Sequence, residues 1–592
     1  MKEKPQQNQE AAFRHLGAIF FRRVEELGER PFIKLQRGDR FEEISWRDFG
    51  TKVRATILGL YSLGVRKGER VAVLADNRVE WLCADAATLA GGLPNVVLSP
   101  RLSDPTTLRI LGHSGSRVVF VEDEIGLGRI LNLKGQLPAL AYIIVMDQTD
   151  FHPTDTITFD GLLSRGRMVG AERIKEILES VQPDDLASII YTSGSTGEPK
   201  GVMRTHGNIL SNIKGGTEIL PSKPEELFVI VLSLNHLLGR FGFHKSMANG
   251  RTTAIVEATE LEVDLATIRS LSPTAMTLVP RVMERIWGAI LADGKNRDKW
   301  ETIEAMEREK ASCGSPTSDE VQQYETLRGS LKESVKRALG GRIKYISYAG
   351  APMAPRIMHF FDVIRIPLLG SYGLTECGGV TLSELGEYRQ GSLGKPFPNV
   401  ELRIADDGEI LVRGPSVMPG YFENPKLTRE VLDPDGWFHT GDLGTIDSDG
   451  SLRVVGRKKD VFYCSDGSNI YPAQIELQLE NDSFIRQAVL LGDHRPFISA
   501  LVVPDRSRIS ADLKREESSL ADGELERILW ERVERINEGL EHYEKIRKVV
   551  VLHQDFPEKV RSVTAFQKIK IDRKAVTDMF QKEIEEIYRA DR

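Results

Sequence analysis

Short apolar runs that alternate with amphipathic stretches constrain the fold of this chain more than any other feature. Within residues 71–203 the runs VAVLAD, RVVFVED, AYIIVMD and ASIIYTS have the length and composition of buried strands. Residues 80–90 and 104–111, which lie between them, have helical periodicity. A second series follows, with LFVIVLS, TTAIVEA, TAMTLVP, KYISYAG and IPLLGSYG as candidate strands. This alternation predicts an α/β architecture with largely parallel sheets.

The pattern changes twice further along the chain. Residues 290–340 are highly charged and helical, which favours a solvated helical hairpin on the surface of the large domain. Beyond residue 391 short strands and turns dominate, and ELRIADDGEILVRG and GTIDSDGSLRVVG each carry the Asp-Gly signal of a β-hairpin.

The main domain boundary is predicted at residues 457–460. Residues 1–457 would form a large N-terminal domain of α/β subdomains plus a β-rich subdomain. Residues 458–592 would form a small α+β C-terminal domain, in which strands and helices alternate and residues 517–542 form one long helix.

Composition excludes several classes of protein. The net charge of −7 gives no support for nucleic-acid binding, which usually requires a concentrated basic face. The four cysteines, Cys83, Cys313, Cys377 and Cys464, lie too far apart for a metal site and favour a reducing compartment. The N-terminus has no signal-peptide pattern, and no apolar run is long enough to span a membrane. We therefore expect a cytoplasmic protein whose membrane contact, if any, is peripheral and at the inner face; no oligomeric state is predicted.

The segment YTSGSTGEPKG, residues 191–201, follows the last strand of the first series. Its glycines let backbone N–H groups approach phosphate oxygens, its hydroxyl groups add donors, and Lys200 neutralises charge. It is not a Walker A loop, because Pro199 and Gly201 flank the lysine. A flexible surface linker is the alternative interpretation, but a linker needs neither the preceding strand nor the single lysine.

Two further segments follow candidate strands in the large domain. SLNHLLGR places His236 at the carboxyl end of a strand, where open α/β sheets bind ligands, although a lone histidine is more often a core residue. GSYGLTECG offers the Tyr372 ring face, the Thr375 hydroxyl and the Glu376 carboxylate, a hard ligand suited to Mg²⁺. The alternative for Glu376 is an ordinary surface carboxylate.

Three more segments complete the set. SYAGAP, residues 347–352, is a turn of small residues against which a flat ring can lie. WFHTGDLG holds Asp442 in a predicted tight turn, where it could accept hydrogen bonds from two ribose hydroxyl groups or simply cap the turn. GRKKD contains Arg457 and Lys459 at the predicted boundary, although a basic run is normally a solvated loop.

In their order along the chain, these segments resemble those of the adenylate-forming superfamily, which contains acyl-CoA synthetases, peptide-synthetase adenylation domains and luciferases. The resemblance covers nearly the whole chain and is closest to the long-chain fatty acyl-CoA synthetases. It implies a mobile C-terminal domain and an ATP-dependent reaction in two steps. A carboxylic acid, most simply a medium- or long-chain fatty acid, forms an acyl-adenylate and pyrophosphate. Coenzyme A then takes the acyl group and AMP is released.

The resemblance also assigns residues to roles. Nucleotide contacts fall on Thr192, Ser193, Gly194, Ser195, Thr196, Gly197, Lys200, Gly350, Ala351, Pro352, Ser371, Tyr372, Gly373, Thr375, Asp442, Arg457 and Lys459. Mg²⁺ would be bound by Thr192 and Glu376. The catalytic set would be Thr192, His236, Thr375, Glu376 and a lysine near the C-terminus. His236 would line the acyl pocket, and Lys459 would be the hinge of the small domain.

Two lysines compete for the terminal catalytic role. Lys570 lies three residues before Arg573, as in relatives, whereas counting forward from Thr564 selects Lys568. We favour Lys570, because the block from Lys570 to Val576 matches as a whole.

Other functions stay open at this stage. An acyl-AMP ligase would pass the acyl group to the thiol of an acyl carrier protein instead of coenzyme A. An inactive protein that binds acyl chains or nucleotides is the alternative from another class. A P-loop ATPase is disfavoured by the residues that flank Lys200.

Overall fold

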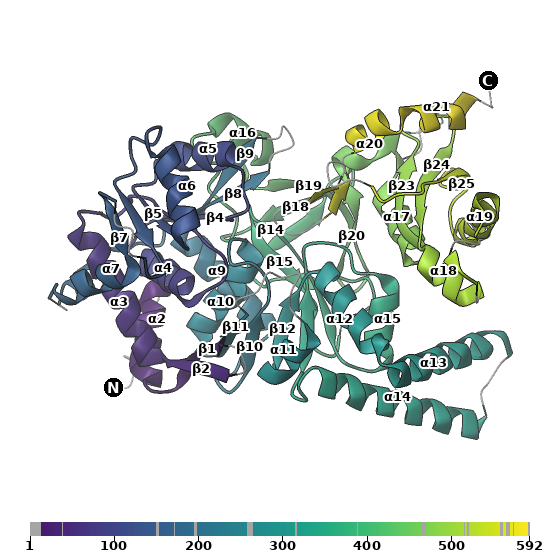
Figure 1. Cartoon of the computed structure of the whole chain (residues 1–592), viewed down its shortest axis with the longest axis horizontal. Coiled ribbons are helices and arrows are strands. Elements are labelled where there is room, and N and C mark those ends of the chain that lie inside the picture. The colour runs from purple at the N-terminus through teal and green to yellow at the C-terminus, as the bar shows by residue number, and fades with distance from the viewer. Residues whose placement is uncertain are drawn as a thin grey trace. The chain divides into compact units, whose positions relative to one another are not determined.

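A computed structural model describes residues 14–37, 40–149, 153–170, 172–193, 198–256, 264–313, 317–387, 389–463, 469–513, 515–517, 520–556, 561–563, 569–571 and 573–589. The chain divides into two compact units (Figure 1). The first comprises residues 1–350, 360–402 and 412–438, and the second comprises residues 351–359, 403–411 and 439–592. The boundary predicted at residues 457–460 falls inside the second unit and stays a prediction.

The first unit contains a seven-stranded sheet whose central strands are completely buried. Its strands are, in spatial order, β7 (Thr156–Thr158), β6 (Tyr142–Val145), β5 (Val118–Val121), β3 (Val71–Leu74), β4 (Asn95–Leu98), β8 (Leu186–Ser193) and β9 (Pro199–Thr205). Every neighbouring pair is parallel except β8 and β9. Burial on both faces explains why these strands are continuous apolar runs in the sequence.

A nine-stranded sheet lies beside it in the same unit (Figure 1). Its strands are, in order, β16 (Lys395–Pro396), β15 (Gly378–Leu382), β14 (Leu368–Leu374), β13 (Tyr345–Tyr348), β12 (Ala275–Leu278), β10 (Leu227–Ile230), β11 (Thr252–Ile255), β1 (Pro31–Arg37) and β2 (Arg40–Ser45). The strands from β14 to β1 pair in parallel, and antiparallel strands complete both edges. The predicted α/β architecture is confirmed.

Helices connect these strands. They are α2 (Leu16–Leu27), α3 (Trp46–Ser62), α4 (Val79–Ala90), α5 (Asp104–Ser114), α6 (Glu124–Lys134), α7 (Phe159–Arg167), α8 (Arg173–Ser180), α9 (His206–Ile219), α10 (Leu237–Asn249), α11 (Leu265–Leu271), α12 (Pro280–Ala292) and α16 (Pro425–Val431). Side-chain caps fix many of their starts: Ser45, Ser103, Asp123 and Thr205 each accept a hydrogen bond from the first turn. In the described residues, no helix has the length and apolar content needed to cross a bilayer.

The charged segment forms two long helices, α13 (Gly294–Cys313) and α14 (Ser318–Ala338), which extend together in Figure 1. Tyr324 of α14 donates a hydrogen bond to Glu307 of α13 at 2.7 Å. One side of the pair is buried, because the Trp300 ring packs edge-on against Phe360 with the ring centroids 4.9 Å apart. Apolar contacts therefore anchor the two helices to the rest of the first unit, while many of their other residues are exposed to solvent.

Strands β17 (Glu401–Ile404), β18 (Glu409–Arg413), β19 (Phe438–Ile446) and β20 (Leu452–Arg457) form a four-stranded sheet in that order. Gly408 and Gly450 adopt positive φ angles at the two Asp-Gly turns, as the hairpin signals predict.

The C-terminal residues of the second unit form a three-stranded sheet of β23 (Ile485–Leu491), β24 (Ile498–Pro504) and β25 (Ile546–Val551). The other elements of the described residues are α15 (Pro355–Val363), η1 (Lys458–Asp460), β21 (Phe462–Tyr463), β22 (Asn469–Ile470), α17 (Pro472–Asn481), α18 (Arg506–Leu513), α19 (Asp522–Glu538), β26 (Arg561–Val563), β27 (Ile569–Ile571), α20 (Arg573–Met579) and α21 (Gln581–Arg589). The helix predicted for residues 517–542 is shorter, because it ends before Gly539.

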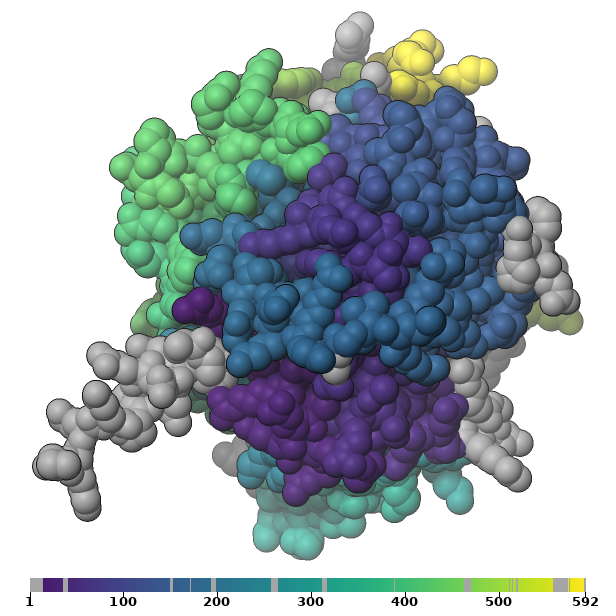
Figure 2. Space-filling model, turned by 90° about the vertical axis from the view of Figure 1, so that its left-hand side faces the viewer, coloured from purple at the N-terminus to yellow at the C-terminus, as the bar shows by residue number. Residues whose placement is uncertain are grey.

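Figure 2 shows N-terminal residues in purple beside later residues of the first unit in blue. Helices α3 and α7, from these two parts of the sequence, pack very closely at Gly166. A Cβ atom at this position would overlap the carbonyl oxygen of Ala55 in α3. Only glycine permits this approach of the two helix backbones.

We predict that Gly166→Ala destabilises the first unit by about 1–3 kcal/mol, because the added methyl group forces the two helices apart. Urea unfolding measures the effect. Gly128→Ala in α6 is the matched control, since no atom lies within 4 Å of a Cβ there. The control should be neutral or more stable by up to about 1 kcal/mol, and equal destabilisation by both changes would contradict the packing argument.

Candidate active site

The predicted phosphate loop connects two antiparallel strands. Thr192 of β8 pairs with Lys200 of β9, and Ser193 pairs with Pro199. A Walker A loop leads from a strand into a helix, whereas this loop joins two strands. The structure therefore agrees with the sequence, which does not match the Walker A pattern. The loop residues Gly194, Ser195, Thr196 and Gly197 lie outside the described residues. Paired residues share one face of a sheet, so Thr192 and Lys200 project to the same side.

Lys200 and Glu376, which are 176 residues apart in the sequence, form an ion pair. The Lys200 Nζ lies 2.8 Å from Glu376 Oε1, and only 9% of the Glu376 side chain is exposed. Tyr421 completes the group: its hydroxyl accepts a hydrogen bond from Lys200 at 2.6 Å and donates to Glu376 at 2.8 Å. The Lys200 Nζ also lies 4.4 Å from the centre of the Tyr421 ring. The structure thus brings together Lys200 and Glu376, which were predicted site residues, and Tyr421, which was not predicted.

The turn that carries Thr375 and Glu376 joins β14 to β15, and Arg204 fixes its backbone. The Arg204 guanidinium donates to the carbonyl oxygens of Ser416 at 2.8 Å, Glu376 at 3.2 Å and Thr375 at 3.4 Å. Burial lowers the pKa of Arg204 to about 10, so it stays charged at neutral pH. The carbonyl oxygen of Glu376 also accepts a hydrogen bond from the Met418 N–H at 2.7 Å.

The donor set at this site suits a magnesium ion. Thr192 Oγ1 is buried and has no hydrogen-bond partner among the described residues. Together with the Glu376 carboxylate it offers hard oxygen ligands, which Mg²⁺ prefers. The described residues hold no cluster of three or more His, Cys, Asp or Glu side chains suited to a metal. Mg²⁺ usually takes one or two protein carboxylates and fills its remaining positions with water and phosphate oxygens.

The turn at residues 347–352, which the family resemblance assigns to an adenine-binding wall, begins within β13, and Ser371, Tyr372 and Gly373 lie in β14. Ser371 Oγ donates to the Thr381 carbonyl oxygen at 2.8 Å, and the Tyr372 side chain is 8% exposed. Gly373 packs against the backbone of Gly378 and Gly379 so closely that a Cβ atom would not fit. Gly350 follows β13 with a φ of 90°, which favours glycine. Ala351 and Pro352, the other two residues of the predicted wall, are assigned to the second unit.

His236 lies immediately before α10 and is half-buried. Burial lowers the pKa of His236 to about 4, so its imidazole is neutral at physiological pH. Further along α10, at helical spacings of four, come Arg240 and His244, which the sequence analysis missed. Both contact Asp85 of α4 at 2.7 Å.

Arg240, His244 and Asp85 therefore form a buried cluster of charged and polar side chains between α10 and α4. Arg240 also donates to Ser188 and Asn95. Although burial raises the pKa of Asp85, the nearby Arg240 and His244 hold it below its usual value. The spacing of four residues, which places Arg240 and His244 on the same face of α10, was a signal present in the sequence. Charged side chains are normally exposed, so the spacing alone does not predict a buried cluster.

Asp442 and Arg457 pair across the β19–β20 hairpin in the second unit. Arg457 Nε lies 3.0 Å from Asp442 Oδ1. The prediction that Asp442 occupies a tight turn is wrong, because it lies within β19, next to the positive-φ residue Gly441. Glu409 accepts a hydrogen bond from the Gly441 N–H at 2.8 Å and lies 3.1 Å from Lys458 Nζ. Lys459, the predicted hinge, follows within η1.

Lys570 lies in β27 and pairs with Ser562 of β26, whereas Lys568 lies outside the described residues. Arg573, three residues after Lys570, makes two hydrogen bonds to Glu476 at 2.7 and 2.8 Å. It also donates to the Leu490 carbonyl oxygen at 3.1 Å. Arg573 therefore anchors the segment after the lysine to α17 and β23.

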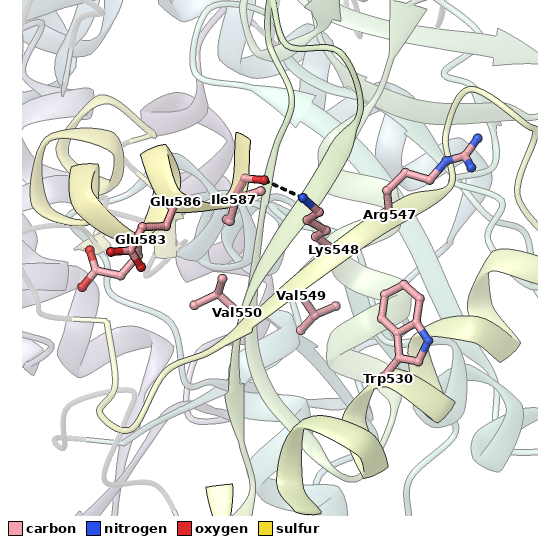
Figure 3. A pocket seen from close by; sticks show the side chains of 8 residues that line it. All are labelled: Trp530, Arg547, Lys548, Val549, Val550, Glu583, Glu586 and Ile587. Atoms are coloured by element: carbon pink, nitrogen blue, oxygen red, sulfur yellow. Dashed lines mark hydrogen bonds between the residues drawn. The ribbon is translucent and has the colours of Figure 1, made fainter. Parts of the chain in front are cut away.

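An open groove of about 460 Å³ lies elsewhere in the second unit (Figure 3). Trp530 of α19 lies on one side of β25, and Glu583 and Glu586 of α21 lie on the other. None of the predicted site residues lines this groove.

The chain was compared with known proteins. The sequence model described as "AMP-binding enzyme" matches residues 20–422, and that described as "AMP-binding enzyme C-terminal domain" matches residues 459–592. A "Long-chain-fatty-acid--CoA ligase FadD15" from Mycobacterium tuberculosis is 33% identical over 568 residues, which is 92% of each chain. "Long chain acyl-CoA synthetase 7, peroxisomal" from Arabidopsis thaliana is 28% identical and matches 82% of this chain and 72% of its own length.

Solved structures share the fold. The adenylation domain of a carboxylic acid reductase from Segniliparus rugosus, solved with AMP and a co-purified carboxylic acid, has a TM-score of 0.74. The match covers 99% of this chain and 96% of that domain at 22% sequence identity.

We predict that His206 makes the stability of the first unit depend on pH. It is buried at the start of α9, and burial lowers its pKa to about 3. Below the unfolded pKa of about 6.5, the unfolded chain binds a proton that the folded chain excludes, so stability falls as the pH falls. Between pH 7 and 5 this one group costs about 2 kcal/mol.

His206→Leu should therefore reduce the stability lost between pH 7 and 5 by about 2 kcal/mol. Urea unfolding at both pH values measures the loss, and the change between pH 7.5 and 8.5 should be the same in both proteins. Identical losses in the variant and the parent would refute the assignment of a neutral, buried imidazole.

Proposed function

Because this chain belongs to the AMP-binding enzyme family, we propose that it joins a long-chain fatty acid to coenzyme A in an ATP-dependent reaction. The acid carboxylate attacks the α-phosphorus of ATP, which forms an acyl-adenylate and releases pyrophosphate. The thiol of coenzyme A then attacks the acyl carbon, and AMP leaves. Support for the fatty acid comes from the relatives, which carry the name long-chain-fatty-acid–CoA ligase and match across most of their length.

The main structural support for this proposal is the contact between Lys200 and Glu376, because it places an ammonium group beside a buried carboxylate. Lys200 would bind a phosphate oxygen as a point charge. Glu376 and Thr192 would hold Mg²⁺, which neutralises charge on the phosphate oxygens. Thr375, in the same turn, would donate its hydroxyl to a phosphate or acyl oxygen.

The remaining residues take the roles that the family resemblance implies. The neutral His236 would line the acyl pocket at the end of β10, where ligands bind in open α/β sheets. Tyr372 would face adenine, and Asp442 and Arg457 would bind ribose and phosphate. Lys459 would be the hinge, and Lys570 would stabilise charge that develops during adenylation.

One experiment tests the activity and its substrate together. Fatty acids of increasing length, with aromatic acids for comparison, are assayed for acid-dependent exchange of pyrophosphate into ATP. Active acids are then tested for thioester formation with coenzyme A and with a phosphopantetheine-bearing carrier protein. Preference for the carrier protein would identify an acyl-AMP ligase, and absence of exchange with every acid would favour an inactive binding protein.

Glu376→Gln should lower pyrophosphate exchange by at least about 100-fold, because it removes the charge of the metal ligand and almost no volume. The fold is monitored by thermal unfolding, which should stay cooperative. Exchange at the parent rate would refute the role of Glu376 as a metal ligand.

Lys570→Ala should lower adenylate formation from acid and ATP by about 100-fold or more, because a positive charge at the reacting centre is lost. When acyl-adenylate is supplied, thioester formation should continue at about the parent rate. Lys568→Ala is the matched control, and we expect it to be mild in both assays. A severe defect in Lys568→Ala with a normal Lys570→Ala would reverse the assignment of the two lysines.

A further inference from the structure

Tyr421 is a buried residue whose hydroxyl group lies between the two charges of the candidate phosphate site. It receives a hydrogen bond from Lys200 at 2.6 Å and gives one to Glu376 at 2.8 Å. The same oxygen of Glu376, Oε1, also faces Lys200 at 2.8 Å. The three groups therefore form a closed triangle in which each contacts the other two.

The backbone around Tyr421 is fixed to the strand that carries Lys200. The Phe422 N–H donates to the Gly201 carbonyl oxygen at 2.8 Å, and the Met203 N–H donates to that of Gly420 at 3.2 Å. The Tyr421 N–H donates to Thr428 Oγ1 at 2.9 Å. These hydrogen bonds fix the backbone of residues 420–422 to β9, so the Tyr421 side chain extends from a fixed point beside Lys200.

Both charges of the triangle are engaged by protein groups. Lys200 donates to Glu376 and to Tyr421, so a move of its ammonium group toward a phosphate would compete with these two contacts. Separation of the pair would leave a largely buried carboxylate without a countercharge, which is unfavourable. Glu376 would hold a divalent cation, whose charge would offset that penalty and would leave Lys200 able to turn toward phosphate.

We propose that Tyr421 is a positioning residue that holds Lys200 and Glu376 as a closed ion pair, so that binding of ATP phosphates and of a divalent cation at this site is energetically coupled. The inference rests on the proposed function for the identity of the two ligands. Coupling of this kind is reciprocal, since each ligand raises the affinity of the other by the same factor.

Equilibrium binding measures the coupling without any catalytic turnover. The dissociation constant of ATP is determined by calorimetry with EDTA and again with saturating Mg²⁺, and the ratio of the two values is the coupling factor. For the parent protein we expect a ratio of about 5–150. Tyr421→Phe keeps the ring beneath Lys200 but removes both hydrogen bonds, and should lower the ratio by about tenfold or to near one.

Tyr61→Phe is the matched control. The Tyr61 hydroxyl is also buried, and it donates to the Gly91 carbonyl oxygen at 3.0 Å, outside the phosphate site. This variant loses a buried hydroxyl group in the same way, so its coupling factor should equal that of the parent. A ratio in Tyr421→Phe that equals the parent ratio would overturn the inference, whatever the change in thermal stability.

A second variant keeps the test decisive if Tyr421→Phe is too unstable to measure. Glu376→Gln removes the carboxylate through which Tyr421 acts and should bring the coupling factor close to one. The double variant with Tyr421→Phe should then show no further change. A ratio in Glu376→Gln that equals the parent ratio would overturn the inference.

The proposed function fails separately, if the parent protein shows neither ATP binding nor pyrophosphate exchange. An active parent whose coupling factor is insensitive to Tyr421 contradicts only the positioning role.

Discussion

The guanidinium group of Arg204 is completely buried and donates to backbone carbonyl oxygens in two distant segments, the turn at Glu376 and the segment at Ser416. Lys200 and Arg204 belong to the same strand, so β9 delivers the ammonium group and also fixes the turn that opposes it. A buried carbonyl oxygen that loses its donor costs about 1–3 kcal/mol. In the candidate phosphate site, the turn that carries Glu376 is therefore held by one arginine that cannot itself reach solvent, together with the Met418 N–H.

A similar arrangement supports the start of α10. His236 precedes the helix, and the buried Arg240 and His244 bind the same carboxylate, Asp85, from α4. An ion pair of this kind adds little net stability, but removal of one partner leaves an uncompensated buried charge. Its contribution is to fix α10 relative to α4, and so to fix the position of His236 at the edge of the sheet.

Many parallel strands of the two large sheets were predicted, because burial on two faces leaves continuous apolar runs. The fully buried β4 and the antiparallel edge strands β2, β9, β15 and β16 were missed. The family resemblance placed Lys200 and Glu376 in one nucleotide site, but their direct ion pair was not predicted. Arg204 and Tyr421 were not predicted, because an arginine in a strand is normally exposed and the hydrogen-bond partners of these two side chains lie 45 to 221 residues away. Asp442 was predicted in a tight turn, but the strand continues through Gly441, which has a positive φ angle. The helix predicted for residues 517–542 begins only at Asp522 and ends before Gly539.

The antiparallel pairing of Thr192 with Lys200 has a consequence for how sequences of this kind can diverge. Side chains alternate along a strand, so inserting one residue in β9 before Lys200 would turn the lysine to the opposite face. An insertion in the loop between the two strands would leave both side chains where they are. A change in length at the tip of the hairpin would therefore keep Thr192 and Lys200 on one face of the sheet, whereas a change within its arms would place them on opposite faces.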